Sequence, residues 1–385
     1  MNIILFDTNR EDFYPLSLTR PISYFRIGIL TIVEKWSLYF QSISVLTDDY
    51  LTKKFPARIL DDNIWINSQV IPSDEILTEI KNLRIGECLK KNSTLLAFRN
   101  SEFVNTDLNI VQSNSNFRYL SCLTDIFSLN GDEILSDITI LKLKSNNSLS
   151  VDKGNHLIGN DIFIEEGVKI NCAVLDSRDG PIYIGKDVEI MPGCLIKGPF
   201  AICNNSVMKM GVKVYGPTTI GPYCKVGGEI NNSVFFGYSS KAHDGFLGNS
   251  VVGEWCNLGA DANNSNLKNN YDNVKLWNYS LESFKDTGLQ FCGLIMGDHS
   301  KCGINTMFNT GTIIGVGANV FGSGFPRNFI PSFSWGGASG FTIHKLEKFF
   351  NTAEIVMKRR GCNLADDREI LSKVYDMTKR YRNEH

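Results

Sequence analysis

The sequence has little net charge, few histidines and no long apolar run. Its formal charge is −2 over 385 residues, so there is no electrostatic case for nucleic acid as a partner. No run of about 18 apolar residues occurs, and we therefore expect no helix that spans a membrane. The start, Met1 to Phe6, lacks the basic segment of a signal peptide and is predicted to be a strand.

The ten cysteines form no Cys-x-x-Cys pair and follow no regular spacing. Such pairs are what cysteine-based zinc sites and redox motifs are built from. We therefore expect free thiols, no metal site, and a reducing, cytoplasmic location.

A six-residue repeat dominates the middle of the chain. Eight aliphatic side chains in succession stand six positions apart: Ile184, Ile190, Ile196, Ile202, Met208, Val214, Ile220 and Val226. Neither an α-helix nor an ordinary strand has this period. Hexapeptide repeats predict a parallel β-helix, in which each turn buries its apolar face only by stacking on the next.

The same rhythm returns on both sides of this stretch, at Ile158, Ile164, Ile170, Phe246, Val252, Leu258, Met296, Cys302, Phe308, Ile314 and Val320. We predict that the coil spans residues 158–325 and that these side chains point inward. The rhythm breaks at 176–180, 231–245 and 263–291, which predicts loops that leave the coil. Solenoids often keep their binding residues in such loops.

The two ends of the chain have ordinary periodicities. Residues 1–125 predict a small α/β domain with a mostly parallel sheet, because strand patterns alternate with helix patterns. The strands are expected at 1–6, 43–47, 64–71 and 94–98, and the helices at 28–40 and 74–83. Residues 126–157 predict a connecting helix and a polar linker. Residues 326–385 predict a link rich in Pro and Trp, then two helices at about 342–360 and 364–382.

Four segments carry a resemblance to a known family: Leu18-Thr19-Arg20-Pro21-Ile22-Ser23, Asp125-Ile126-Phe127, Ser240-Lys241-Ala242-His243, and 329–337. The chain resembles the bifunctional N-acetylglucosamine-1-phosphate uridyltransferase/glucosamine-1-phosphate acetyltransferases. It is most similar to a short bacteroidetes-type branch labelled sugar-1-phosphate (glucose-1-phosphate) nucleotidyltransferase. The resemblance covers nearly the whole chain. It implies a shortened nucleotidyltransferase domain, a left-handed coil with three hexads per turn, a homotrimer, and acyl-CoA bound between neighbouring coils.

The resemblance places an acetyl-transfer site on the coil. His243 matches the general base, which takes a proton from the acceptor, although a solvated loop histidine is the plainer interpretation. Lys241 and Asn257 are implied to contact the substrate, and Ala260 to contact CoA. The Asn-Tyr pair of the family that also contacts CoA falls either at Asn266, by position, or at Asn270-Tyr271, by residue type. All these asparagines could equally satisfy their own turns.

Two departures put the acceptor in doubt. Phe246 stands where the family has a tyrosine, and Glu229 lies where a lysine would bind the sugar phosphate. A glutamate is unfavourable beside an anionic acceptor, so the acceptor need not be glucosamine-1-phosphate. His299 is an alternative base, although its place within a regular hexad predicts a residue of the coil surface.

The nucleotidyltransferase features are less complete. The loop after the first strand, Asp7 to Asp12, lacks glycine, and Gln69 takes the place of the carboxylate that would hold Mg²⁺. Arg10 and Arg20 could hold a sugar phosphate, because arginine binds phosphate in a bidentate manner, or they could be ion-pair residues between domains. Mg²⁺ is expected only if nucleotidyl transfer is retained.

Three functions remain open from the sequence. The favoured one is CoA-dependent acyl transfer from acetyl-CoA to an amino sugar, sugar phosphate or sugar nucleotide. The second is nucleotidyl transfer from a nucleoside triphosphate to a sugar-1-phosphate, which would yield a UDP- or dTDP-sugar. The third is a catalytically inactive trimeric scaffold.

Overall fold

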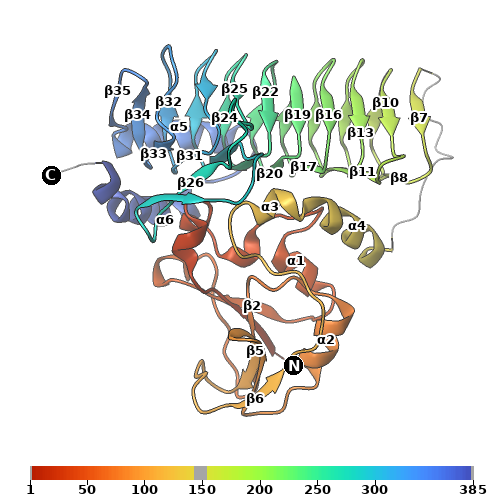
Figure 1. The fold of residues 1–385 in the computed structure, drawn as a ribbon, viewed down its shortest axis with the longest axis vertical. Helices are drawn as coiled ribbons and strands as arrows, with labels where there is room; N and C mark the ends of the chain where they lie inside the picture. Colours follow the sequence, from red (N-terminus) through yellow and green to blue (C-terminus); the bar gives the residue numbers. More distant parts are fainter. Residues whose placement is uncertain (1, 143–153, 383–385) are drawn as a thin grey trace.

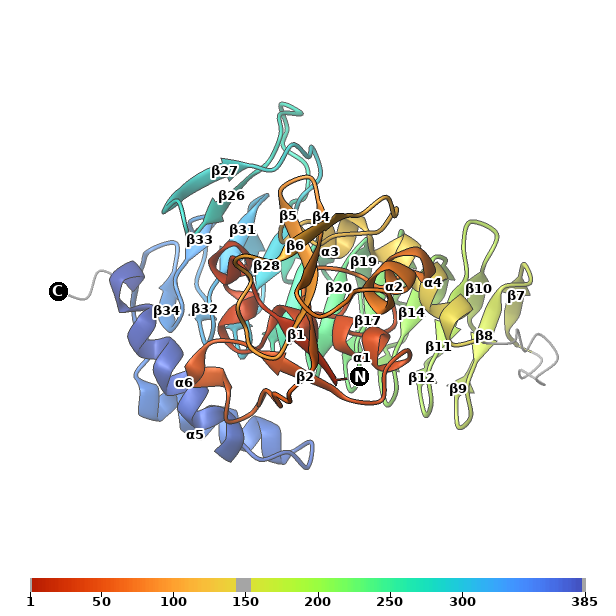
Figure 2. The same cartoon turned by 90° about the horizontal axis from the view of Figure 1, so that it is seen from below.

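The structure, a computed structural model, describes residues 2–142 and 154–382. A long parallel β-helix runs through the molecule, and the N-terminal α/β region lies along one of its sides (Figure 1). The two C-terminal helices, α5 (Leu346–Lys358) and α6 (Ala365–Met377), pack near the last turns of the coil (Figure 2). The polar linker expected at 145–148 lies outside the described residues.

The coil has three sides, named here in chain order. The first side contains β7 (His156–Ile158), β10 (Val174–Asp176), β13 (Leu195–Lys197), β16 (Lys213–Tyr215), β19 (Glu229–Asn231) and β22 (Phe246–Gly248). Two short strands continue it, β25 (Asn263–Asn264) and β30 (Met307–Phe308).

The second side has nine parallel strands: β8 (Ile162–Ile164), β11 (Ile182–Ile184), β14 (Phe200–Ile202), β17 (Thr218–Ile220), β20 (Val234–Gly237), β23 (Val251–Glu254), β28 (Leu294–Met296), β31 (Thr312–Ile314) and β33 (Phe329–Ile330). Its outward side chains are buried as well as its inward ones, and among them are Ala201, Thr219, Ile295 and Ile313. The second side is therefore the one that the N-terminal region covers.

The third side has ten strands: β9 (Lys169–Ile170), β12 (Glu189–Ile190), β15 (Val207–Met208), β18 (Lys225–Val226), β21 (Ser240–Lys241), β24 (Asn257–Leu258), β29 (Lys301–Cys302), β32 (Asn319–Val320), β34 (Ser334–Gly337) and β35 (Gly340–Ile343). All pair in parallel except β35, which turns back antiparallel on β34. β33 and β34 are further rungs of the coil, so the strands continue through the segment predicted as a link after residue 325.

The inward positions predicted from the hexads are confirmed through most of the coil. All eight aliphatic residues from Ile184 to Val226 are at most 2% exposed and belong to one apolar cluster inside the coil. Their stacking in register removes each side chain from water only once the next turn is in place.

Two predicted loops have different outcomes. Residues 231–245 do not leave the coil, because β20 and β21 continue its second and third sides there. The broken rhythm comes from a shorter turn, and it moves the inward position from Phe246 to Leu247, which pairs with Ile230. Residues 263–291 do leave the coil, and they form a hairpin of β26 (Lys275–Asn278) and β27 (Ser283–Asp286).

The N-terminal sheet is mixed, but three of its five strand pairings are parallel, which agrees with the prediction of a mostly parallel sheet. Its order is β2-β1-β3-β5-β4-β6, made of β1 (Asn2–Phe6), β2 (Ile43–Leu46), β3 (Asn63–Asn67), β4 (Glu87–Lys91), β5 (Thr94–Asn100) and β6 (Asn109–Gln112). β5 runs antiparallel to both β3 and β4. The tight turn at Asn92, whose φ is 55°, folds β4 onto β5, and the charged β4 carries no clear strand pattern in the sequence.

The helices mostly agree with their predictions. Helix α2 (Asp74–Lys81) begins at Ser73, whose hydroxyl accepts the Ile76 N–H. Helix α1 (Ile32–Ser37) is shorter than the predicted 28–40, because Thr31 and Glu34 form a capping box that fixes its start. Helices α3 (Asp125–Ser128) and α4 (Asn130–Ile140) form the expected connection.

Of the described helices, none combines the length and the apolar character needed to cross a bilayer.

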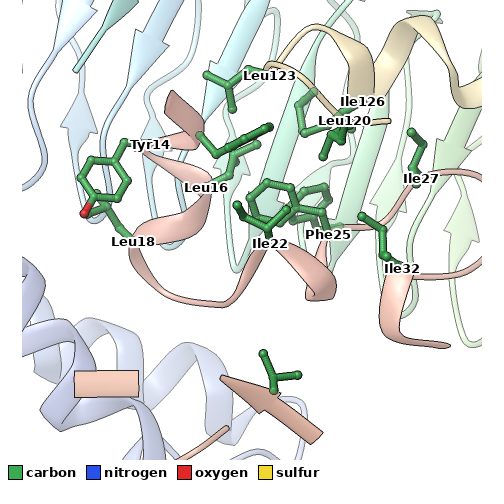
Figure 3. Packing of buried hydrophobic residues seen from close by; sticks show 14 of the residues in the cluster. Tyr14, Leu16, Leu18, Ile22, Phe25, Ile27, Ile32, Leu120, Leu123 and Ile126 are labelled. Atoms are coloured by element: carbon green, nitrogen blue, oxygen red, sulfur yellow. The ribbon is translucent and has the colours of Figure 1, made fainter. Parts of the chain in front are cut away.

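The N-terminal region and the coil share one apolar core. A single cluster contains Ile3 and Phe13 of the N-terminal region, Phe236 and Trp255 of the coil, and Phe349 of α5. Figure 3 shows labelled members of this cluster, from Tyr14 to Ile32 and from Leu120 to Ile126, gathered between the N-terminal segments and the strands of the coil.

A buried charge cluster joins α1 to α4. The Lys35 ammonium contacts the carboxylates of Glu133, at 2.8 Å, and Asp137, and Glu133 also pairs with Arg118. Lys35, Glu133 and Asp137 have no exposed surface. Breaking such a group leaves a buried charge without a partner, so the cluster fixes how α4 sits against the N-terminal region.

Replacement of Ile202 by Asp tests the inward stack. The side chain is fully buried on β14, and an unpaired carboxylate there costs several kcal/mol. We expect Ile202→Asp to unfold the coil or to lower its melting temperature strongly. Leu195→Asp is the control, since Leu195 on β13 is 50% exposed. Equal melting of the two variants in circular dichroism would contradict the inward assignment.

Candidate functional site

His243 lies at the corner where the third side of the coil turns into the first. The turn 242–245 joins β21 to β22, and the side chains of His243 and Asp244 are both exposed. The peptide N–H of Asp261, in the next turn, donates to the Asp244 carbonyl at 2.9 Å. The two turns therefore stack on one another at the same corner of the coil.

Two further predicted residues come to this corner. Asn257 pairs in register with Ser240 on β21 and with Lys301 on β29, and its side chain is exposed. Ala260 lies in the turn stacked on that of His243, and its carbonyl accepts the Asn305 N–H at 2.8 Å. Ala260 itself is half-buried. His243, Asn257 and Ala260 thus lie on two adjacent turns of the coil, and together they are named here the corner site.

The two candidate positions for the Asn-Tyr pair of the family, Asn266 and Asn270-Tyr271, lie in different parts of the structure. Asn266 remains beside the coil, and its amide donates to the Asn249 side chain at 2.8 Å. Asn270 and Tyr271 lie in the segment that leads to the hairpin. Asn270 donates to Asp272, and Tyr271 is 64% exposed. Of these residues, Asn266 is the one that a hydrogen bond holds against the coil, at the end of β22 that is opposite to the His243 turn.

Lys241 is not a surface ligand, which corrects the implied substrate contact. It occupies an inward position on β21, in register with Val226, and is 1% exposed. Its ammonium donates to the carbonyls of Gly227 at 3.1 Å and of His243 at 3.0 Å. Burial lowers the pKa of Lys241 to about 8, although nearby Asp244 opposes this. Lys241 therefore anchors the backbone of the His243 turn from inside the coil.

Arg10 and Arg20 are both bound by carboxylates. Arg10 pairs with Asp7 at 2.8 Å and with Asp48 at 2.9 Å. Arg20 pairs with Glu254 of the coil at 2.8 Å and also contacts Asp298. Both arginines are 7% exposed. Arg20 is thus an ion-pair residue between the N-terminal region and the coil, whereas Arg10 pairs within its own region.

Arg20 also lines a small pocket at the junction of the three parts of the chain. The pocket has a volume of about 170 Å³, and Lys54, Trp255, His299 and Asp367 line it as well. Asp367 belongs to α6 and Trp255 follows the strand β23. The pocket is therefore enclosed only because the N-terminal region, the coil and α6 meet there.

His299 is buried in this junction, so the expectation of a coil-surface residue is wrong. It is 4% exposed, its ring stacks on Trp255 at 6.2 Å between centroids, and Phe349 of α5 meets it edge-on. Burial lowers the pKa of His299 to about 3, so the imidazole is neutral near pH 7. Within the described chain its Nδ1 has no hydrogen-bond partner. The sequence offered no signal for this burial, because the covering residues come from distant segments.

The donor groups at the N-terminal sheet do not fit a catalytic Mg²⁺. Both carboxylate oxygens of Asp7 are occupied, by Arg10, Thr47 and the Ile22 N–H. Gln69 donates to the Leu120 carbonyl at 2.7 Å and accepts from Thr8 at 2.6 Å. Throughout residues 2–142 and 154–382, no group of three or more His, Cys, Asp or Glu is placed to hold a metal ion.

Replacing Lys241 tests its place inside the coil. Because its pKa is lowered in the folded chain, only the unfolded chain holds this proton between about pH 8 and its ordinary 10.5, so folded stability rises with pH across that window. Lys241→Met should lack this rise. We therefore expect the free energy of unfolding of the wild type, relative to that of Lys241→Met, to rise by about 2 kcal/mol from pH 7 to pH 10, measured by urea unfolding. Lys169→Met, an exposed position on the same side, should show no such change. A pH-independent difference for Lys241→Met would contradict the burial.

The N-terminal part of the chain is similar to a known family of sugar nucleotidyl transferases. Residues 3–146 match the family model of that description, which covers well under half of the chain. A search of curated proteins finds no match.

Among solved structures, the chain is similar to several acyltransferases. One is AntD, an N-acyltransferase from Bacillus cereus in complex with dTDP and coenzyme A, with 14% identity over 56% of this chain and 98% of that one, and a TM-score of 0.24. The polySia-specific acetyltransferase NeuO has 12% identity over 50% and 87%, with a TM-score of 0.24. The Francisella novicida UDP-N-acetylglucosamine acyltransferase has 13% identity over 58% and 78%, with a TM-score of 0.20. At these identities and scores the likeness carries no argument about function.

Proposed function

We propose that this chain is a transferase that moves an acyl group from acyl-CoA to an amino sugar, a sugar phosphate or a sugar nucleotide at the corner site. The observation that carries the proposal is the turn of His243. It presents an exposed imidazole, and the next turn of the coil carries Asn257 and Ala260. The buried Lys241 holds the backbone of the His243 turn from inside the coil. A fixed turn with an exposed imidazole is what a general base needs.

The chemistry needs only a base and a hydrogen-bond donor. The nitrogen or oxygen of the acceptor attacks the thioester carbon. As it does so, the imidazole of His243 takes the proton of that amine or hydroxyl. A new C–N or C–O bond forms, the C–S bond breaks, and the thiolate of CoA takes up the proton. The amide of Asn257 is available to donate to the developing oxyanion, which is the kind of stabilisation that acyl transfer depends on.

A homotrimer is part of the proposal. His243 and Asp244 stand exposed on a convex turn, and a convex turn offers no wall to hold a substrate against the base. A neighbouring coil packed beside the corner would supply that wall. The resemblance to the bifunctional uridyltransferase/acetyltransferases points to the same arrangement, with acyl-CoA between adjacent coils.

His243→Ala tests the base. We expect loss of acetyl transfer by at least a hundredfold with nearly unchanged affinity for acetyl-CoA, because a base acts on the acceptor. Turnover with a panel of amino sugars, glucosamine-1-phosphate and UDP- or dTDP-amino sugars is followed by mass spectrometry, since ten cysteines would confuse thiol reagents. Acetyl-CoA affinity is measured by calorimetry.

His156→Ala is the matched control for this experiment, since His156 is an exposed histidine on β7 at the other end of the coil. Unchanged turnover of His243→Ala would rule out His243 as the base. If the wild type neither binds acetyl-CoA nor acylates any acceptor, the chain is better described as a scaffold.

Nucleotidyl transfer is the second candidate, and the family match of residues 3–146 favours it. The side chains argue against it, because Asp7, Arg10, Arg20 and Gln69 are all engaged within the protein. The N-terminal domain is then a docking and stabilising element, or a binding domain for a sugar phosphate, without the metal-dependent step.

A pyrophosphate assay separates the two candidates. We expect no Mg²⁺-dependent pyrophosphate release from UTP or dTTP with glucose-1-phosphate or N-acetylglucosamine-1-phosphate, because the carboxylates needed for the metal are occupied. An active sugar-1-phosphate nucleotidyltransferase run in parallel is the positive control. Release that depends on both Mg²⁺ and the sugar phosphate would overturn this expectation and make nucleotidyl transfer the main activity.

A further inference from the structure

A groove lies between the hairpin β26–β27 and the adjacent edge of the coil. It has a volume of about 590 Å³ and is named here the hairpin groove. Its lining contains three cationic side chains (Lys268, Lys275 and Arg327), three aromatic ones (Trp277, Phe284 and Phe329) and two uncharged polar ones (Thr310 and Asn328). No residue proposed for the corner site lines it.

The charges of the groove are of one sign. Its lining contains no carboxylate, and neither Lys275 nor Arg327 forms an ion pair with any described residue. Both side chains are exposed. Asp286 lies opposite Lys275 across the hairpin, but its carboxylate accepts the N–H of Gly288 at 2.8 Å. The ammonium of Lys268 donates to the Asn273 carbonyl at 2.7 Å, which holds this cation at the rim.

The aromatic wall of the groove is fixed in place. The ring of Trp277 stacks on Phe329 of the coil, with centroids 4.4 Å apart and planes 10° from parallel. Phe284 meets Trp277 edge-on at 5.4 Å and is itself 45% exposed. A large apolar side chain so exposed beside a pocket can stack on a flat ring at little ordering cost, because Trp277 already limits its movement.

We propose that the hairpin groove binds the nucleoside diphosphate portion of a substrate. The three cations suit two linked phosphates, since lysine and arginine are the usual phosphate ligands, and the exposed face of Phe284 suits the base. Acyl-CoA and sugar nucleotides share this chemistry. The identification of the ligand as one of these two rests on the proposed acyl transfer, whereas the groove's affinity for nucleoside diphosphates does not.

The distance to the corner site fits one long ligand. The groove and His243 lie at opposite ends of the first side of the coil, which is about 10 Å across. They are also separated by a few rungs along the coil axis, with about 4.8 Å between neighbouring rungs. The distance between them is therefore on the order of 15 Å. A ligand with its diphosphate in the groove needs a flexible arm of that length to reach His243. Acyl-CoA has such an arm, and a sugar nucleotide does not, so the geometry favours the acyl donor as the occupant.

Calorimetric titration of the full chain tests the proposal. We expect ADP and CoA to bind and adenosine, which lacks phosphate, to bind at least tenfold more weakly. Lys275→Ala combined with Arg327→Ala should weaken ADP binding at least tenfold. Phe284→Ala tests the stacking face without removing the half-buried Trp277. The control is Lys285→Ala, on the opposite face of the same hairpin, where affinity should not change.

The order of the affinities for CoA, dTDP and UDP-glucose identifies the natural ligand of the groove. Tighter binding of CoA than of dTDP or UDP-glucose, lost in the double variant, supports the acyl donor as the natural ligand. Tighter binding of dTDP or UDP-glucose, equally lost in the double variant, overturns that assignment in favour of the sugar nucleotide. Absence of ADP binding, or equal affinity in the double variant, overturns the groove as a nucleotide site.

A further measurement distinguishes the proposal of a nucleotide site in the hairpin groove from the proposal that His243 is the general base. His243→Ala should bind ADP and CoA with wild-type affinity, because the groove and the corner site share no residue. If His243→Ala retains turnover while the double variant loses CoA affinity, the base assignment fails and the groove stands. If the double variant retains affinity while His243→Ala loses turnover, the groove fails and the base stands.

Discussion

The stacking of inward side chains along the coil is the constraint on which the rest of the structure depends. Most rungs contribute one apolar residue per side, and these residues form a single interior cluster from Ile162 to Ile330. A short parallel strand by itself buries nothing, so the coil exists only as a stack. The His243 turn and the hairpin, where the two sites are proposed, both project from corners that this stack fixes.

The N-terminal region depends on the coil as well. Its core and the outward face of the second side of the coil form one continuous apolar cluster that also takes in α5 and α6. Two buried charge groups, Lys35 with Glu133 and Asp137, and Arg20 with Glu254 and Asp298, determine how the parts meet. Buried ion pairs give modest net stability but a large penalty when misplaced, which suits them to specify one docking arrangement. The arginines of the nucleotidyltransferase-like segment therefore act here as interface and internal ion-pair residues.

The candidate chemistry lies away from that interface. The corner site and the hairpin groove both belong to the part of the coil where the hexad rhythm is disturbed, one at a shortened turn and the other at the longest insertion. Disturbed turns are where a solenoid can present side chains without loss of its core. Under the proposed function, the coil positions the acyl donor and the base.

The sequence alone determined the coil, because a period of six leaves no other fold and each inward residue from Ile184 to Val226 follows from spacing only. It also determined α2, with its cap at Ser73, and the excursion at 263–291. The tertiary structure alone decided the rest, wherever burial comes from distant segments. It placed Lys241 inside the coil, where a one-residue shift after a shortened turn changes which side chains face inward. It buried His299 under the N-terminal region and α5, and it supplied carboxylates to Arg10 and Arg20. It also placed Arg327 and Lys275 in the lining of one groove. These residues are 52 positions apart in the sequence (327 minus 275), so no local pattern predicts that they lie together.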